Sequence, residues 1–239
     1  MDTTPNGWTV VDADTGVLSY TYKFPGGTAN SLAARMPDGR MFVMSPPMGV
    51  DEGVFDDLLQ FGEVGAVATN NGFHHLGLPA WEKRFPDARF YASPKAAIRI
   101  AKKNKDVGAL EPLSDLIPLL GDDIGLRDAD GTKCGESWVW ARTGGGYAWY
   151  TSDILANMPG LPKAFFVRQA FKLTGSAPGY RIFKLAMFAM VKDRKGVLRQ
   201  FAQDVEKAPP SIVIPGHGEL ITRASVAQET RDLLQSAIG

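Results

Sequence analysis

The hydrophobic and polar positions of the first third of the chain alternate in the two-residue period of β-strands. Leu18–Phe24 and Leu32–Met36 both show this alternation. The residues Met-Pro-Asp-Gly-Arg at 36–40 predict a hairpin turn, because Pro followed by Asp-Gly supplies the backbone angles that such a turn needs. Met41–Met44 is then expected to be the return strand.

From residue 51 onward, segments with helical spacing alternate with short apolar runs. Apolar side chains recur every three or four positions in Asp51–Phe61, which predicts a helix there. The following elements are expected in order: a buried strand at Val64–Ala68, a short helix at Ala80–Phe85, a strand at Arg89–Ala92, a helix at Lys95–Lys103, an extended segment at Leu116–Leu120, and a hairpin of Ser137–Arg142 with Tyr147–Thr151.

The region 155–210 has a different character, being mostly helical in pattern and rich in Phe and Met. It contains the almost wholly apolar run Ile182–Val191, for which we consider four roles: core or subunit packing, a lid, an acyl pocket and a membrane interface. A strand at Ser211–Pro215 and a closing amphipathic helix at Ala224–Ile238 follow. Mixed strands and helices of this kind predict an α/β sandwich in which helices cover sheets.

Composition narrows the class of protein. The 239 residues are 44% hydrophobic and 22% charged, which is ordinary for a globular chain and suits one domain. The net charge is zero, so no bulk attraction to nucleic acid is expected. A single cysteine, Cys134, excludes an internal disulfide framework and favours the reducing cytoplasm. We expect neither a secretory signal nor a transmembrane segment.

The three histidines are the first candidates for chemistry. His74 and His75 follow the predicted strand at 64–68, and His217 follows the predicted strand at 211–215 in the sequence Pro-Gly-His-Gly. Imidazole is the commonest metal ligand in proteins at neutral pH. A loop histidine that merely hydrogen-bonds a carbonyl, or one exposed on a turn, is the simpler alternative.

Asp153 also lies at the end of an apolar strand, three residues after the aromatic run 147–150. Its simpler interpretation is a cap for a helix beginning at Ile154. Together, His74, His75, Asp153 and His217 form a set of nitrogen and oxygen ligands suited to one divalent metal ion, with zinc as first choice and iron as second.

These residues resemble the motifs of the metallo-β-lactamase superfamily. Thr69–Gly77 is similar to that family's T-H-x-H-x-D-H-x-G motif, Thr151-Ser152-Asp153 to its later G-D motif, and Ile214–Gly218 to its last P-G-H-G motif. The order and the intervals also match. The resemblance implies a four-layer αββα sandwich, with residues 155–210 as a helical insertion.

The departures from the family pattern fall on one of its two metal sites. The positions of the H-x-H histidines are Asn70 and Gly72, and the region 140–144, where a third histidine is expected, contains none. The positions of the second site are His74, His75, Asp153 and His217, all of which carry ligand atoms. The resemblance therefore implies a mononuclear site in place of a dinuclear one.

The function that this resemblance implies is metal-dependent hydrolysis of a small ester, thioester or lactone. Four protein ligands would close the site, so catalysis would require Asp153 or one histidine to swing away from the metal. Asp153 is expected either to bind the metal or, when displaced, to act as a general base. Asn70, Asn71 and Arg142 are candidate substrate contacts, with turn formation and a salt bridge as their alternatives. Two other classes stay open: a noncatalytic protein that binds a small molecule or a partner, and a metal-free scaffold that forms homo-oligomers through the apolar insertion.

Overall fold

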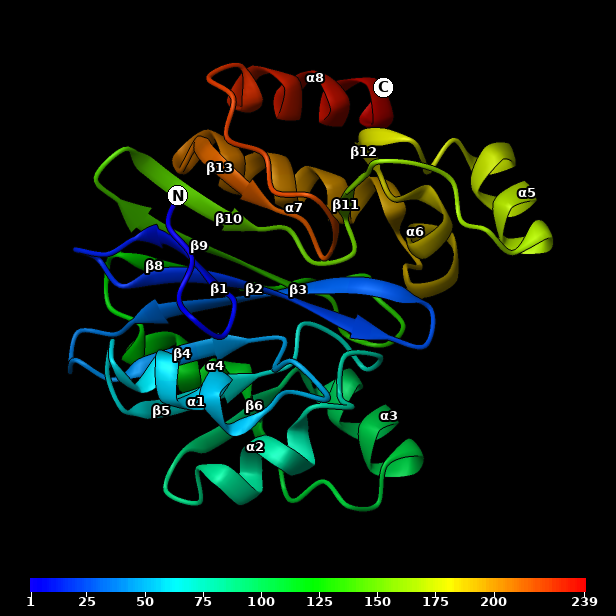
Figure 1. Cartoon of the computed structure of the whole chain (residues 1–239). Helices are drawn as coiled ribbons and strands as arrows, with labels where there is room; N and C mark the ends of the chain where they lie inside the picture. Colours follow the sequence, from blue (N-terminus) through cyan, green and yellow to red (C-terminus); the bar gives the residue numbers. More distant parts are fainter.

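The computed structural model describes all residues, 1–239. The larger sheet of the protein contains seven strands, which lie side by side in chain order (Figure 1). The first four strands are antiparallel neighbours, whereas β4 to β7 run parallel. The strands are β1 (Trp8–Asp12), β2 (Val17–Phe24), β3 (Gly27–Arg35), β4 (Met41–Met44), β5 (Val64–Ala68), β6 (Arg89–Ala92) and β7 (Glu111–Pro112).

A second sheet of four strands has the order β13-β10-β9-β8, and a small third sheet has the order β12-β11-β14. Within the second sheet, β10 pairs antiparallel with β9 and parallel with β13. The strands are β8 (Ile124–Asp128), β9 (Ser137–Thr143), β10 (Gly146–Tyr150), β11 (Leu155–Met158), β12 (Gly179–Ile182), β13 (Pro210–Ile214) and β14 (His217–Gly218).

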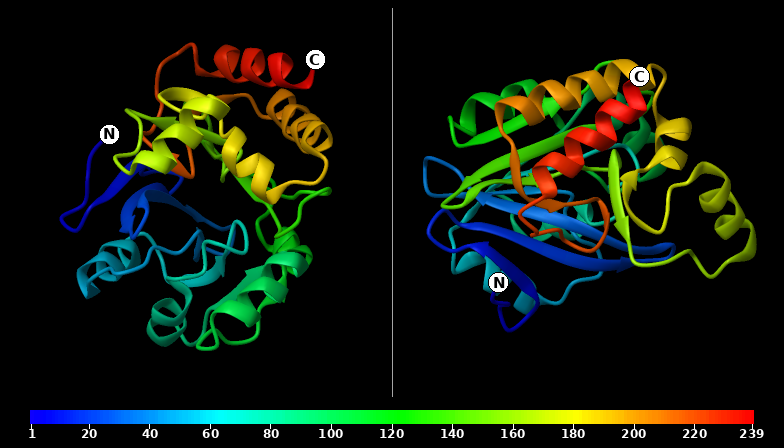
Figure 2. Two further views of the ribbon diagram at one scale, coloured as in Figure 1. Left: turned by 90° about the vertical axis from the view of Figure 1, so that its right-hand side faces the viewer. Right: turned by 90° about the horizontal axis from the view of Figure 1, so that it is seen from above.

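Helices cover the outer faces of both large sheets (Figures 1 and 2). The outer face of the seven-stranded sheet packs against α1 (Glu52–Leu59), α2 (Leu78–Arg84) and α3 (Pro94–Lys103). The outer face of the four-stranded sheet packs against α7 (Arg194–Lys207) and α8 (Val226–Ile238). The remaining helices are α4 (Leu113–Leu116), α5 (Phe165–Thr174) and α6 (Lys184–Met190).

The alternation of side chains within each central strand places the sheets face to face. In β5, Ala66 and Ala68 belong to the core between the sheets, whereas Val67 packs under the outer helices. In β10, Ala148 faces the inner core and Trp149 faces α7. Strands buried on both faces have continuous apolar sequences, which is why these runs stand out in the chain. The predicted αββα sandwich is confirmed.

Most predicted elements occur within a few residues of their expected bounds. Val64–Ala68 and Arg89–Ala92 coincide with β5 and β6, and the hairpin turn at 36–40 joins β3 to β4. The prediction of an extended segment at Leu116–Leu120 is wrong. These residues form the end of α4 and a 3₁₀ turn at Ile117–Leu119. Its apolar run is helical because Leu113, Leu116 and Leu120 all point into the core between the sheets.

Residues 155–210 differ from a purely helical insertion. They contain the strands β11 and β12, which join β14 in the third sheet. Their last helix, α7, packs against the four-stranded sheet and so belongs to the sandwich itself. Only α5 and α6 extend beyond the four layers (Figure 1). No helix of the chain combines the length and the apolar character needed to cross a bilayer.

Candidate metal centre

The candidate residues lie just beyond the carboxyl ends of parallel strands. His74 lies in the loop between β5 and α2, Asp153 lies in the turn after β10, and His217 begins the two-residue strand β14 that follows β13. Since β4 pairs parallel with β5 and β10 pairs parallel with β13, the two sheets bring these loops to one edge of the sandwich. Such strand ends are the usual place for ligand sites in α/β folds.

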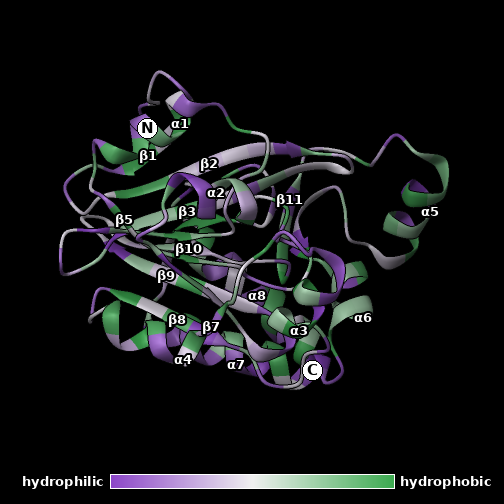
Figure 3. Cartoon of the chain, turned by 90° about the horizontal axis from the view of Figure 1, so that it is seen from below, coloured by the Kyte–Doolittle hydropathy of each residue, from purple (hydrophilic) through white to green (hydrophobic).

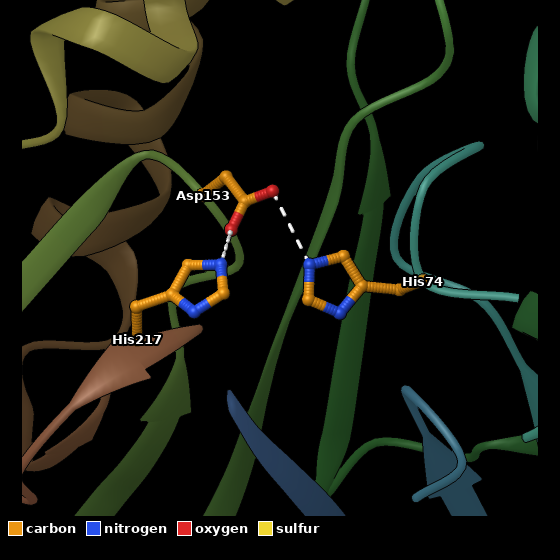
Figure 4. Close-up of side chains that lie close together, drawn as sticks. All are labelled: His74, Asp153 and His217. Carbon is orange, nitrogen blue, oxygen red and sulfur yellow. Dashed lines mark ion pairs between the residues drawn. The ribbon is translucent and has the colours of Figure 1, made fainter. Parts of the chain in front are cut away.

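Three of the four predicted ligands meet there (Figure 4). His74 Nε2 lies 3.3 Å from Asp153 Oδ2, and His217 Nε2 lies 3.2 Å from Asp153 Oδ1. One ligand atom from each of the three residues falls within 4.8 Å of the others. The Asp153 side chain is 6% exposed, so the two rings flank a buried carboxylate.

The hydrogen bond of His217 to the main chain determines which of its two ring nitrogens can bind a metal ion. Its Nδ1 lies 2.8 Å from the carbonyl oxygen of Thr28, which only accepts, so Nδ1 carries the proton. The Nε2 atom of neutral His217 therefore presents a lone pair toward Asp153. Oδ1 of Asp153 is buried and has no hydrogen-bond partner. Two facing acceptors require either a second proton on His217 or a cation between them.

His74 is held from its other side by two hydroxyl groups. Its Nδ1 lies 3.1 Å from Ser45 Oγ and 3.2 Å from Tyr22 Oη. Burial raises the pKa of Tyr22 to about 12, so its hydroxyl is protonated at neutral pH. These contacts fix the ring so that Nε2 points at Asp153, as the outer partners of metal-binding histidines commonly do. Tyr22 and Ser45 were not predicted as site residues, although Ser45 also ends an apolar strand.

The charges of the three residues are mutually dependent. Burial by itself would raise the pKa of Asp153, but the positive charges of His74 and His217 outweigh it and hold that pKa well below its usual range. Burial by itself would lower the pKa of His217, and the Asp153 carboxylate reverses this and raises it. The cluster therefore holds positive charge against Asp153, whether as a proton or as a metal ion.

The structure places His75 outside this cluster. The adjacent side chains of His74 and His75 point in different directions, and Nδ1 of His75 lies 3.4 Å from Nδ2 of Asn104. Burial and the charge of Arg99 lower the pKa of His75, so its ring is neutral at physiological pH. His75 is not among the residues lining the cavity beside the cluster.

Asn70 and Asn71, predicted as substrate contacts, are fully buried and support the site from behind. Asn71 Oδ1 accepts from the backbone N–H of Phe73, which fixes the amide orientation. Its Nδ2 then donates to Asp153 Oδ2 at 2.9 Å and to Glu136 Oε2 at 3.2 Å. Asn70 donates to Ser152 Oγ at 2.6 Å.

Glu136 is the member of this network that the sequence reasoning missed. It is fully buried, and it accepts hydrogen bonds from the Ser152 hydroxyl and from the Asp153 backbone N–H. Burial and the neighbouring Asp153 carboxylate raise the pKa of Glu136 to about 8. A signal did exist: an acidic residue directly before an apolar strand, which the isolated bridge between Asn71 and Glu136 brings beside the histidine loop.

Arg142, the third predicted substrate contact, lies near the carboxyl end of β9, whereas Glu136 and the cluster lie at the amino end of this strand. Its Nε lies 2.7 Å from Asp123 Oδ1, and its guanidinium stacks on the Tyr147 ring. The alternative interpretation, a salt bridge at a strand end, describes this geometry. The alternative interpretation of Asp153, a cap for a helix beginning at Ile154, does not apply, since the strand β11 follows that residue.

Two cavities that share Phe24 and His217 in their linings lie beside the cluster. One of about 150 Å³ is lined by His74, Asp153 and His217 together with apolar side chains including Phe24, Met48 and Phe73. A second of about 410 Å³ extends from Phe24 and His217 toward the loop 159–162 and α5. The reactive groups are thus surrounded mainly by apolar surface, as in most small-molecule sites.

The three residues are chemically suited to a divalent metal. Two imidazole nitrogens and one carboxylate form a common three-ligand set for catalytic zinc, which keeps its fourth position open. The unpartnered Oδ1 of Asp153 and the lone pair on His217 Nε2 are the atoms that such an ion would engage.

Comparison with known proteins gives the fold. No protein-family model matches the sequence, and no curated protein is similar to it. Among solved structures, the chain is similar to the DIM-1 metallo-β-lactamase (14% identity, 93% of this chain and 94% of that chain, TM-score 0.59). It is also similar to the metallo-β-lactamase FIM-1 from Pseudomonas aeruginosa in the mono-zinc form (12%, 100% and 98%, TM-score 0.57). A third match is a putative diflavin flavoprotein fragment from Nostoc (15%, 98% and 98%, TM-score 0.58). The chain therefore has the metallo-β-lactamase fold, carried by a highly divergent sequence.

Proposed function

We propose that this protein is a hydrolase of small esters, thioesters or lactones that uses one divalent metal ion bound by His74, Asp153 and His217. The observation that carries the proposal is the 3.2 Å separation of His217 Nε2 from the buried Asp153 Oδ1, because both atoms are acceptors while His217 is neutral. Zinc is the first choice of metal because the ligands are two imidazoles and one carboxylate. The similar FIM-1 structure is in a mono-zinc form.

Three ligands leave room for substrate, which the predicted set of four did not. A divalent cation, when bound, supplies Lewis acidity toward a substrate carbonyl group. The chain itself orients the ligands: Thr28 fixes the tautomer of His217, and Asn71 fixes the carboxylate of Asp153. Phe24 and Phe73 line the cavity with apolar surface, which suits it to the apolar part of a small substrate.

We assign Asp153 to metal binding in preference to the general-base role. A carboxylate whose pKa lies well below its usual range is a weak proton acceptor at neutral pH. The hydroxyl of Tyr22 lines the same cavity and remains protonated, so it is available to donate a hydrogen bond to a substrate oxygen. We place the enzyme in the cytoplasm because its single cysteine forms no disulfide.

The test combines metal content with turnover. Protein purified without a histidine tag is analysed for bound metal, then assayed on a panel of esters, thioesters and lactones. We expect about one metal ion per chain and turnover in the parent protein, loss of both in His217→Ala, and retention of both in His75→Ala. Equal hydrolysis by the parent and His217→Ala would rule out the proposal. Stoichiometric metal without turnover on any substrate would favour the noncatalytic binding role.

A further inference from the structure

The segment between Asp153 and Asp193 carries charge of one sign only. It contains no acidic residue and six basic ones, in a protein whose overall net charge is zero. The basic residues are Lys163, Arg168, Lys172, Arg181, Lys184 and Lys192. None of the six forms an ion pair, so the positive charge of the segment is uncompensated.

The same segment exposes large apolar side chains. Phe166 is 85% exposed and Leu173 is 87% exposed on α5, and Phe188 is 67% exposed on α6. Phe166 and Leu173 are seven residues apart, which places them on one face of the helix. Figure 3 shows α5 projecting away from the layered body of the molecule with hydrophobic positions along it. Only Phe171 of this helix is buried.

Apolar and basic side chains occur together on this surface. A groove of about 840 Å³ is lined by Leu173 and Phe188, by four cations, Lys184, Lys192, Arg194 and Lys195, and by one carboxylate, Asp193. The guanidinium of Arg168 lies 5.8 Å from the ring centroid of Phe165, and that of Arg194 lies 5.5 Å from the ring centroid of Phe188. Exposed aromatic and aliphatic side chains flanked by Lys and Arg are the pattern of a helix that lies in a membrane interface.

We propose that α5 and α6 form a docking surface for an anionic phospholipid bilayer. Phe166 and Leu173 enter the boundary between headgroups and acyl chains, while Lys163, Lys172 and Lys184 face the lipid phosphates. Apolar burial and attraction to negative lipid act together, and neither is strong alone. The surface is continuous with the candidate site, because the cavity of about 410 Å³ beside α5 is lined by both Val167 and His217.

The experiment is co-sedimentation of the full chain with vesicles of phosphatidylcholine alone and of phosphatidylcholine mixed with phosphatidylglycerol. We expect binding to the mixed vesicles only, weakening as salt rises because the charges are exposed. Phe166→Asp and Leu173→Asp should each reduce partitioning by about tenfold or more, since each removes a large apolar side chain from the interface. The triple variant Lys163→Gln/Lys172→Gln/Lys184→Gln should also bind the mixed vesicles more weakly than the parent does, and the difference should be largest at low salt. None of these measurements depends on hydrolysis.

Ile98→Asp is the matched control. Ile98 is 60% exposed on α3, in another basic region that contains Lys95, Lys102 and Lys103. Binding should survive this change. Equal binding to neutral vesicles, equal loss in Ile98→Asp, or no binding by the parent would each overturn the proposal. So would a dimer in solution that Phe166→Asp converts to monomer, because the surface would then be a subunit interface.

Discussion

The Nε2 atom of His217 faces Oδ1 of Asp153 at 3.2 Å, although neither atom is placed to donate a hydrogen bond in the neutral state. The proton of neutral His217 resides on Nδ1, which donates a hydrogen bond to the carbonyl oxygen of Thr28. Burial makes an uncompensated pair of acceptors costly, so this geometry is stable only with positive charge between the two residues.

Removal of metal should therefore lower thermal stability. A ligand that binds only the folded state stabilises it by about 2.7 kcal/mol when its free concentration is about 100 times Kd. For a chain of this length, that corresponds to a loss of roughly 5–10 °C in melting temperature on chelation. The measurement is differential scanning fluorimetry with and without chelator, followed by re-addition of zinc.

The variants His217→Ala and His75→Ala separate a metal effect from a general effect of histidine removal. The melting temperature of His217→Ala should no longer respond to chelator, whereas that of His75→Ala should respond as in the parent. A chelator response that persists in His217→Ala would place the metal elsewhere.

Asn71→Ala should destabilise the protein by about 2–4 kcal/mol, because it leaves Asp153 and Glu136 buried without their shared donor. Urea unfolding measures the change. Asn157→Ala is the control, since its Nδ2 makes a single hydrogen bond to the Glu219 carbonyl near the surface. A similar cost for both changes would show that the buried network contributes nothing particular.

The fold could be predicted wherever burial determines the sequence. Val64–Ala68 is apolar because both of its faces are covered, and such a run has few interpretations. Ile124–Asp128 was not predicted as a strand, because Gly125, Arg127 and Asp128 interrupt its apolar character. The helical turns at 113–119 were missed because Pro118 within an apolar run favours an extended interpretation, whereas packing of three leucines between the sheets decides the conformation.

The site could be predicted to the level of strand ends but not of side-chain directions. His74, Asp153 and His217 each follow an apolar strand. The parallel pairing of β10 with β13 brings Asp153 and His217 together, and the packing of the two sheets adds His74, which follows β5 in the other sheet. The direction of the His75 side chain depends on the backbone dihedral angles of the loop, and the spacing of apolar residues along the chain does not determine these angles. The position of Glu136 directly before an apolar strand marks it as a candidate, but its contact with Asp153 joins two separate loops and cannot be derived from the order of residues along the chain.

Glu136→Gln should change how stability depends on pH. The pKa of Glu136 rises from 4.5 to about 8 in the folded protein, so between these values the folded state holds a proton that the unfolded chain releases. Stability of the metal-free parent should therefore fall as pH rises through that window, by an amount on the order of a few kcal/mol. Glu136→Gln cannot ionise, so urea unfolding between pH 5 and pH 8, roughly the same window, should show a flatter profile. An unchanged slope would assign the effect to another group.

Asp128→Asn should stabilise the protein at neutral pH. Burial raises the pKa of Asp128 from 3.8 to about 6, and the charge of Lys95 only partly opposes this. Above that pKa the folded state holds a costly carboxylate, which the amide avoids, so we expect a gain of about 1 kcal/mol at pH 7 after allowance for partial exposure. At a pH well below the ordinary pKa of 3.8, where the carboxyl is protonated in both the folded and the unfolded state, the gain should disappear. Equal stabilisation at both pH values would point to a cause other than ionisation.

Gly216→Ala should disrupt the site while leaving the sandwich folded. A Cβ atom at Gly216 would lie 2.4 Å from the Ser152 carbonyl oxygen and 3.0 Å from Asp153 Oδ1, so the loop bearing His217 would have to move away from Asp153. The backbone N–H of Gly216 donates to that same carbonyl at 2.8 Å, and this contact aligns the loops that follow β10 and β13. We expect the variant to keep its far-ultraviolet circular dichroism, to lose bound metal and to lose about 2–3 kcal/mol of stability. Gly145→Ala, at a turn where nothing lies within 4 Å of an added Cβ, should retain metal at the parent level. Full metal content in Gly216→Ala would mean that the separation of Asp153 and His217 does not determine binding, and the ligand set proposed here would have to be abandoned.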